Sequence, residues 1–131
     1  WLVQIGEDKG GFYSYDWLEN LAGCHIHSAD EIHEEWQDLK PGDTLQIFVG
    51  TGPKVGAVDP PRSLVIEGWG AYVVEPIDAR SCRLIARSHT DPGPAAVGYV
   101  LGMELPHAIM ERKMLLGIKK RAERAVSRKP A

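Results

Sequence analysis

The sequence predicts an α+β protein in which short helical segments are followed by an antiparallel sheet and then by one long helix. Residues 105–125 carry apolar side chains at spacings of three and four, the pattern of an amphipathic helix. Residues 44–88 change to a period of two and are rich in Val, Ile, Leu and Tyr. Because a lone helix cannot bury its apolar stripe in water, we expect the helix to lie on the sheet around an apolar pocket.

The predicted C-terminal helix has a clear beginning, face and end. Pro106 suits the first helical turn, where its missing N–H removes no hydrogen bond. The basic side chains of the last turns complement the negative end of the helix dipole and indicate a solvated helix terminus. The residues expected on the buried face are Ile109, Met110, Met114, Ile118, Ala122 and Ala125.

Length and composition limit the class of protein. The 131 residues fit a single domain spanning residues 1–131, and 44% hydrophobic with 25% charged residues is ordinary for a soluble globular chain. The net charge of −3 argues against nucleic acid as a partner. No stretch approaches the roughly 20 apolar residues of a membrane span. We therefore expect neither a nucleic-acid partner nor a membrane span.

Cysteine usage points to a reducing compartment. Only Cys24 and Cys82 are present, without a CxxC pair or a zinc framework. We expect reduced thiols in a cytoplasmic protein, with a single disulfide between the two as the open alternative.

Helical signals dominate the N-terminal part of the chain. Residues 1–5 are apolar and fit either a strand or the end of a helix. A short helix is predicted within residues 11–23, with Ser14 as its cap, Gly23 as its stop and an apolar face of Trp17, Leu18 and Leu21.

A second helical signal begins at Ser28. Ser28 and Glu31 have the spacing of a capping box, and Ile32, Trp36 and Leu39 follow at helical spacing. At least a turn or two of helix is therefore expected after Ser28, before Pro41-Gly42 breaks the chain.

Five strands are predicted between the turns. Short connections containing Gly and Pro separate them, as expected for an antiparallel meander. Gly98 and Gly102, four residues apart beyond the sheet, predict close backbone packing or a loop. The predicted strands span residues 44–49, 54–58, 63–67, 71–75 and 82–88.

Several motifs resemble one known family. They are GFYSYDWL (11–18), SADEIHEEWQDLKPGD (28–43), RSLV (62–65), WGAYVVEP (69–76) and MERKMLLGIK (110–119). Together they resemble a bacterial branch of the SRPBCC superfamily, which includes START lipid-transfer domains, the birch-pollen-allergen type and polyketide cyclases. The likeness covers residues 1–125, and the block at 110–119 is its most specific part.

The resemblance implies a helix-grip fold, in which a curved antiparallel sheet wraps around the C-terminal helix and encloses a hydrophobic cavity. It also implies that residues 1–5 are the tail of the first helix. Family members carry a further strand ahead of this point, which this chain is expected to lack. An unpaired sheet edge would then favour association, so we expect a homodimer formed through that edge.

Seven aromatic residues are candidates for the pocket wall, although plain core packing would explain about half of them: Tyr13, Tyr15, Trp17, Trp36, Phe48, Trp69 and Tyr72. Flexible thioethers facing the sheet adapt to variable ligands. Arg87 would anchor a ligand carboxylate if its side of the strand faces the cavity, and is a surface charge otherwise. The predicted ligand-binding residues are Trp17, Trp36, Phe48, Trp69, Tyr72, Arg87, Met110 and Met114.

Signals for metal or catalytic chemistry are weak. One cluster resembles a metal site, but its third histidine lies across a turn, so no metal and no cofactor are predicted. It consists of His25, His27, His33, Glu31 and Glu34. His107 and Glu111 lie one turn apart and fit either a solvated pair or an acid–base pair. No nucleophile elbow, phosphate loop or dinucleotide motif occurs in the sequence, so catalytic residues stay unassigned.

These observations support three hypotheses for function. The first is binding of a small hydrophobic or amphipathic ligand between sheet and helix. The second is an enzyme of the cyclase, dehydratase or hydrolase kind that uses the same cavity. The third is an association module with a collapsed pocket. A pocket without convergent titratable groups would favour binding, and a buried histidine or carboxylate beside a tyrosine would favour catalysis.

Overall fold

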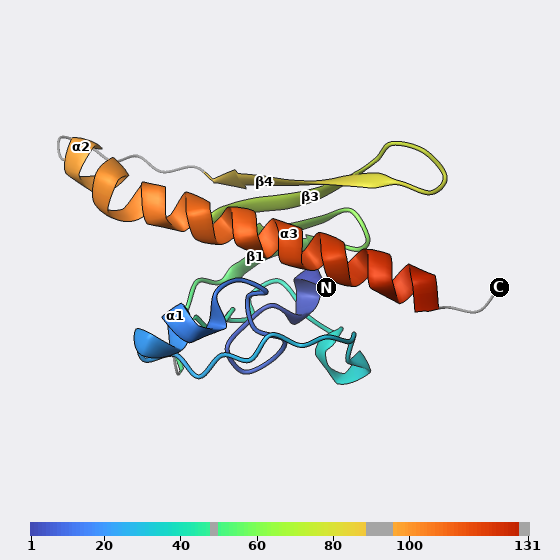
Figure 1. Ribbon diagram of the computed structural model, residues 1–131, viewed down its shortest axis with the longest axis horizontal. Coiled ribbons are helices and arrows are strands. Elements are labelled where there is room, and N and C mark those ends of the chain that lie inside the picture. Colours follow the sequence, from blue (N-terminus) through green and yellow to red (C-terminus); the bar gives the residue numbers. More distant parts are fainter. Residues whose placement is uncertain (48–49, 89–95, 129–131) are drawn as a thin grey trace.

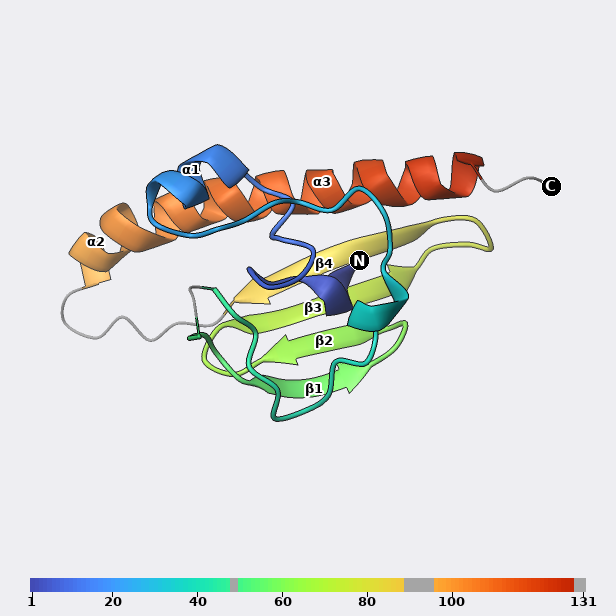
Figure 2. The same cartoon turned by 90° about the horizontal axis from the view of Figure 1, so that it is seen from below.

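The computed structural model describes residues 1–47, 50–88 and 96–128. It is an α+β protein with a four-stranded antiparallel sheet and a long C-terminal helix, α3 (Leu105–Arg128). Helix α3 extends along the sheet, and the N-terminal third of the chain packs against both of them (Figures 1 and 2). The predicted fold class is confirmed at this level.

The sheet is a simple meander with strand order β1-β2-β3-β4. Four of the five predicted strands are confirmed. Each strand pairs antiparallel with the next, and the longest ladder, between β3 and β4, runs from Gly70 opposite Ser88 to Pro76 opposite Cys82. The strands are β1 (Val55–Asp59), β2 (Ser63–Ile66), β3 (Gly70–Pro76) and β4 (Cys82–Ser88).

The strand predicted at residues 44–49 is not present in the part of it that the structure describes. Thr44 forms only an isolated bridge with Lys54, and residues 42–47 run beside residues 51–55 through a few backbone hydrogen bonds, reaching β1 only at Val55. Residues 48–49 lie outside the described residues. Pro53 at the turn and the bulge in β1 keep the pairing from extending into a ladder.

Helical structure in the N-terminal part is sparse. Residues 1–5 contain only a 3-10 turn, η1 (Leu2–Gln4), and the expected helix after Ser28 is reduced to a second 3-10 turn, η2 (Glu34–Trp36). The Ser28 prediction was wrong because its hydroxyl donates to Asp16 instead of capping a helix. The short helix expected within 11–23 is present as α1 (Asp16–Leu21).

Helix α3 continues a helical stretch that begins earlier. Helix α2 (Ala96–Tyr99) leads through a π-helical turn, η4 (Val100–Glu104), into α3. A Cβ atom at Gly98 or Gly102 would meet no atom within 4 Å, so the expectation of close packing there was wrong. Of the predicted buried face, Met114 and Ile118 are buried and Met110 and Ala122 half-buried, whereas Ile109 and Ala125 are exposed.

One hydrophobic core joins the sheet, α3 and the N-terminal segment. The sheet contributes alternate residues of its strands, so that one face of each strand packs inward. The buried members of this core are Ile5, Tyr13, Leu39, Leu45, Val55, Leu64, Ile66, Tyr72, Met114 and Ile118.

Candidate functional site

A cavity of about 410 Å³ lies between the N-terminal half of α3, the sheet and the N-terminal segment. We call it the α3 cavity. Its volume is in the range of small-molecule sites, and its wall is mostly apolar, as in such sites. Its lining residues are Ile5, Phe12, Ser14, Leu18, Glu19, Ala22, Cys24, Ile26, Leu45, Ile47, Ile66, Trp69, Tyr72, Gly102, Pro106, His107, Met110, Glu111 and Met114.

A second space, of about 1030 Å³, lies beneath the C-terminal half of α3, beside the turns that join β1 to β2 and β3 to β4. Its rim carries charged side chains that are mostly in solvent, among them Arg83, Lys119 and Glu123. Among the described residues that line it, none has a buried polar atom without a partner. The α3 cavity is therefore the better candidate for a specific site.

Two buried polar atoms in the wall of the α3 cavity have no hydrogen-bond partner among the described residues. They are the Oε2 atom of Glu19 and the indole Nε1 atom of Trp69. Most buried polar atoms in folded proteins are paired, because an unpaired one has lost its hydration without compensation. An acceptor and a donor left unpaired in the same wall mark this cavity as a place for a polar guest group.

The position of Glu19 follows from how α1 is attached. Its neighbours Asp16 and Asn20 turn inward and satisfy backbone groups of the adjoining segment: Ile26 N–H donates to Asn20 Oδ1 (2.6 Å), and Ser28 N–H donates to Asp16 Oδ2 (2.7 Å). These bonds hold the polar side of α1 against residues 26–28, so Glu19 is turned inward and is only 6% exposed. The apolar side faces outward, with Trp17 67% exposed.

The expected cap and apolar face of this helix were therefore wrong in detail. Ser14 donates its hydroxyl proton to the Met110 carbonyl oxygen of α3 (3.0 Å) rather than capping α1. Leu21 is exposed, and only Leu18 of the predicted face lines the α3 cavity.

The electrostatics of the cavity favour neutral side chains. Burial, with a smaller contribution from the neighbouring Asp16 carboxylate, raises the pKa of Glu19 to about 7. Burial also raises the pKa of the Cys24 thiol, with the Glu7 and Glu19 carboxylates acting in the same direction. Cys24 is therefore an inert thiol rather than an activated nucleophile.

Trp69 joins the sheet to α3 at one wall of the cavity. Its ring contacts His107 edge to face, with ring centroids 5.3 Å apart. Burial raises the pKa of the Tyr72 phenol and the Glu111 carboxylate adds to this, while the nearby Trp69 N–H partly opposes it. The Trp69 N–H and the Tyr72 oxygen do not meet the geometry of a hydrogen bond, so the indole N–H stays without a partner within the described chain.

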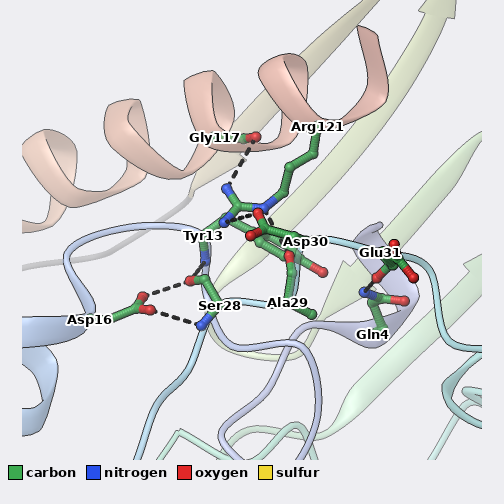
Figure 3. Close-up of polar contacts among 9 residues, drawn as sticks. All are labelled: Gln4, Tyr13, Asp16, Ser28, Ala29, Asp30, Glu31, Gly117 and Arg121. Carbon is green, nitrogen blue, oxygen red and sulfur yellow. Dashed lines mark hydrogen bonds and ion pairs between the residues drawn. The ribbon is translucent and has the colours of Figure 1, made fainter. Parts of the chain in front are cut away.

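The other end of the helix–segment contact is held by Arg121 (Figure 3). Its Nε donates to the Ala29 carbonyl oxygen (2.8 Å), its Nη2 lies 3.2 Å from Asp30 Oδ1, and its guanidinium lies over the Tyr13 ring at 5.1 Å. The side chain is 17% exposed. These contacts hold α3 against the N-terminal segment, and both of these elements contribute to the wall of the cavity.

Tyr13 connects that contact to α1. It is 1% exposed and has a φ of 56°, a conformation that few residues other than glycine adopt. Its N–H donates to Ser28 Oγ (3.0 Å), and Ser28 Oγ in turn donates to Asp16 Oδ1 (2.6 Å; Figure 3). Gly117 allows the close approach, because a Cβ there would collide with the Tyr13 carbonyl oxygen.

Half of the predicted ligand-binding residues line the α3 cavity: Trp69, Tyr72, Met110 and Met114. Trp17 does not, because α1 presents its apolar side to solvent. Trp36 stacks on His33, with ring centroids 4.1 Å apart, away from both spaces. Arg87 is exposed on β4, where it alternates with the inward-packed Ala86, so it is a charge on the outer sheet face. Phe48 lies outside the described residues.

The histidines of the possible metal cluster do not converge. His25 is exposed and 3.8 Å from Glu7, and His33 pairs with Glu35 at 3.2 Å. Over residues 1–47, 50–88 and 96–128, no group of three or more His, Cys, Asp or Glu side chains has metal-binding geometry. His107 and Glu111 both line the α3 cavity but do not lie within ion-pair distance of each other.

Sequence reasoning missed three cavity residues with chemical meaning: Phe12, Glu19 and Cys24. Glu19 occupies a position that the amphipathic pattern assigns to solvent. No local signal marks it, since the bonds that turn it inward join α1 to residues 26–28. The bonding groups Asp16, Asn20 and Ser28 are common in any surface loop.

Comparison with family models, with curated proteins and with solved structures found no significant match. Among the residues that the structure describes, no helix combines the length and apolar character needed to cross a membrane.

Proposed function

We propose that this protein binds one small, largely apolar molecule in the α3 cavity. The observation that carries the proposal is an apolar cavity of about 410 Å³ whose wall contains two buried polar atoms without protein partners, Glu19 Oε2 and Trp69 Nε1. Apolar surface would supply affinity, and these two atoms would fix the orientation of the ligand. Met110 and Met114 would adapt the wall to its shape.

Binding of a solvatochromic apolar dye such as Nile red tests this proposal. We expect saturable binding of one dye per chain, weakened at least about tenfold by Gly102→Phe, which adds a ring to the cavity wall. Gly98→Phe is the matched control, since Gly98 is helical, has open space around it and does not line the cavity. Equal dye affinity of the two variants, or binding that does not saturate, would contradict the proposal.

An acid–base enzyme is the second candidate function. Glu19, with its pKa of about 7, is matched to proton transfer near neutral pH, and Tyr72 lies in the same wall. Such a Glu19 would remove a proton next to a carbonyl group, leaving an enolate that regains a proton from solvent. In heavy water this predicts deuterium exchange into benzylacetone, measurable by mass spectrometry and abolished in Glu19→Gln. Exchange no faster than in buffer would leave binding as the function.

We also propose that the fold is a helix grip and that the chain is a member of the SRPBCC superfamily. What supports this is the order of a meander sheet followed by a long helix beside it, with a cavity between them. An experimental structure in which the sheet does not curve around α3 would contradict it. A cytoplasmic location is supported by the free thiols of Cys24 and Cys82.

Homodimer formation through a sheet edge is part of the same proposal. The outer edge of β1 is bonded to residues 42–43 at Val55, whereas β4 pairs only with β3 within the described chain. The free edge carries Arg83 and Arg87, which repel a second copy at low ionic strength. We therefore expect light scattering to detect dimers that increase with salt. A clean monomer at high protein and salt concentration would contradict this part.

A further inference from the structure

Among the described residues that line the α3 cavity, acidic groups outnumber basic groups. Its wall contains two carboxyl groups, Glu19 from α1 and Glu111 from α3, but no lysine or arginine among the described lining residues. Among the described residues of the wall, the one base is His107, whose ring lies against Trp69. A bound anion would find repulsion from the carboxylates and no fixed positive charge to balance it.

Aromatic rings line the same cavity as these acidic groups. Phe12, Trp69 and Tyr72 come from two separate parts of the chain and line the same space as the two carboxyl groups. The faces of aromatic rings carry partial negative charge and attract organic cations, most strongly where water is excluded. Carboxylates and aromatic rings in one apolar cavity match the recognition of alkylammonium groups.

We infer that the ligand of the α3 cavity is a hydrophobic organic cation, an alkylammonium or arylammonium, whose charged nitrogen lies beside Glu19. The inference rests on the proposed function and adds the charge class of the ligand to it. The hydrocarbon part would lie along Met110 and Met114, which line the same cavity. The cation would supply the partner that the buried Glu19 Oε2 atom lacks within the described chain.

Such a ligand predicts a dependence of affinity on pH. The groups near Glu19 are Asp16 on α1, Glu7 and Cys24 in the N-terminal segment, Tyr72 on β3, and His107 and Glu111 on α3. Burial, helped by the Asp16 carboxylate, holds the pKa of Glu19 at about 7, so the Glu19 carboxyl itself is largely neutral in mild acid. Ionisation of Glu19 on raising the pH creates the charge that an ammonium group binds, and the bound cation in turn lowers that pKa.

Three probes of equal chain length distinguish a cationic, a neutral and an anionic ligand. They are decyltrimethylammonium, decanol and decanoate, each used below its micelle concentration. Affinities are measured by calorimetry on the full chain. At about pH 8 we expect the cation to bind at least about tenfold more tightly than the alcohol, and decanoate most weakly. Between about pH 5.5 and about pH 8, affinity for the cation should rise several-fold while affinity for decanol stays constant.

Glu19→Gln should weaken binding of the cation at about pH 8 far more than binding of decanol, and so remove most of the preference for the cation and most of its pH dependence. The control is Glu104→Gln, because Glu104 is exposed and does not line the cavity, so the full preference should remain.

The outcomes separate the inference from the proposed function. If decanol or decanoate binds as tightly as the cation, and Gly102→Phe weakens that binding, the inferred charge class is wrong and the cavity still binds ligand. If the cation preference survives in Glu19→Gln, the placement of the cation is wrong. If none of the three probes binds saturably, the proposed function fails as well.

Discussion

Helix α3 contacts the N-terminal segment at two places that differ in one respect. Around Arg121, the polar groups brought together are paired: the guanidinium bonds to Ala29, contacts Asp30 and covers the Tyr13 ring. Around Met110, the helix borders a cavity in which the buried Glu19 and Trp69 atoms lack partners. We call the Arg121 end of the helix the satisfied end, because the polar groups there have partners. The Met110 end is the unsatisfied end, because it borders the two polar atoms that have none within the described chain.

This difference indicates a division of roles. Folding alone selects against unpaired buried polar groups, so a region where they are all paired is explained by stability. A region that keeps a buried carboxyl and a buried N–H unpaired is less stable than it could be, and such exceptions concentrate at functional sites. We expect substitutions at the Arg121 end to destabilise the protein, and substitutions at the Glu19 end to stabilise it or leave it unchanged.

The largest effect is expected at Gly117. Gly117→Ala places a Cβ against the Tyr13 carbonyl oxygen, so the helix must move away from the segment. We expect a loss of about 3 kcal/mol in the free energy of unfolding, measured by urea denaturation. Gly98→Ala, in open space, should be neutral or slightly stabilising. Equal effects of the two substitutions would show that α3 does not press on Tyr13.

Arg121→Ala is the next test of the satisfied end. It leaves the Ala29 carbonyl oxygen without its donor and uncovers the Tyr13 ring, so we expect a loss of about 2 to 3 kcal/mol by the same measurement. The ion pair adds little, since Asp30 is largely exposed. Arg124→Ala, at an exposed position of the same helix, should change stability by less than about 0.5 kcal/mol.

Glu19→Gln tests the unsatisfied end. The folded protein keeps a proton on this carboxyl up to about pH 7, whereas the unfolded chain releases it near the ordinary value of 4.5. The stability of the unsubstituted protein should therefore fall as pH rises between these values and not change further above them on account of this group. Glutamine cannot ionise, so the variant should be more stable by about 2 kcal/mol at about pH 8 and unchanged at about pH 4.

Denaturation at several pH values measures this difference directly. A variant less stable than the parent at about pH 8 would mean that Glu19 has a stabilising partner, and the contrast between the two ends of α3 would then fail.

The smallest effect is expected at Trp69. Trp69→Phe keeps a ring against His107 and removes the unpaired N–H, so stability should change by no more than about 1 kcal/mol. Trp36→Phe, at a half-buried position outside the cavity, is the control. A loss well beyond that at Trp69, but not at Trp36, would indicate that the indole N–H is paired in solution.

Periodicity predicted the regular parts of this fold well. The strand expected at residues 82–88 is β4, Cys82–Ser88, and the helix expected from residue 105 begins there and ends at Arg128. These elements are long and strongly patterned, so local preference and tertiary packing agree. The helix expected after Ser28 failed, because the hydroxyl that would cap it bonds to Asp16 instead.

The candidate site was predicted only in part. Tyr72, Met110 and Met114 belong to elements whose inward faces follow from their period, and Trp69 lies in the turn just before β3. Phe12 precedes α1 in a stretch without regular structure, and Glu19 lies on the side of α1 that the apolar pattern assigns to solvent. Trp17 is the opposite case: it is apolar, yet it is exposed, because an apolar residue on a six-residue helix need not face the core.

The sequence by itself determined the α+β order, the meander and the amphipathic helix, because each depends on spacing within one continuous stretch of chain. Only the tertiary structure decided which side of α1 faces inward, and therefore that a carboxyl group lies in the wall of an apolar cavity. The physical reason is that side-chain oxygens of Asp16 and Asn20 accept hydrogen bonds from backbone N–H groups six to twelve residues away. These bonds set the orientation of α1 against its own apolar pattern.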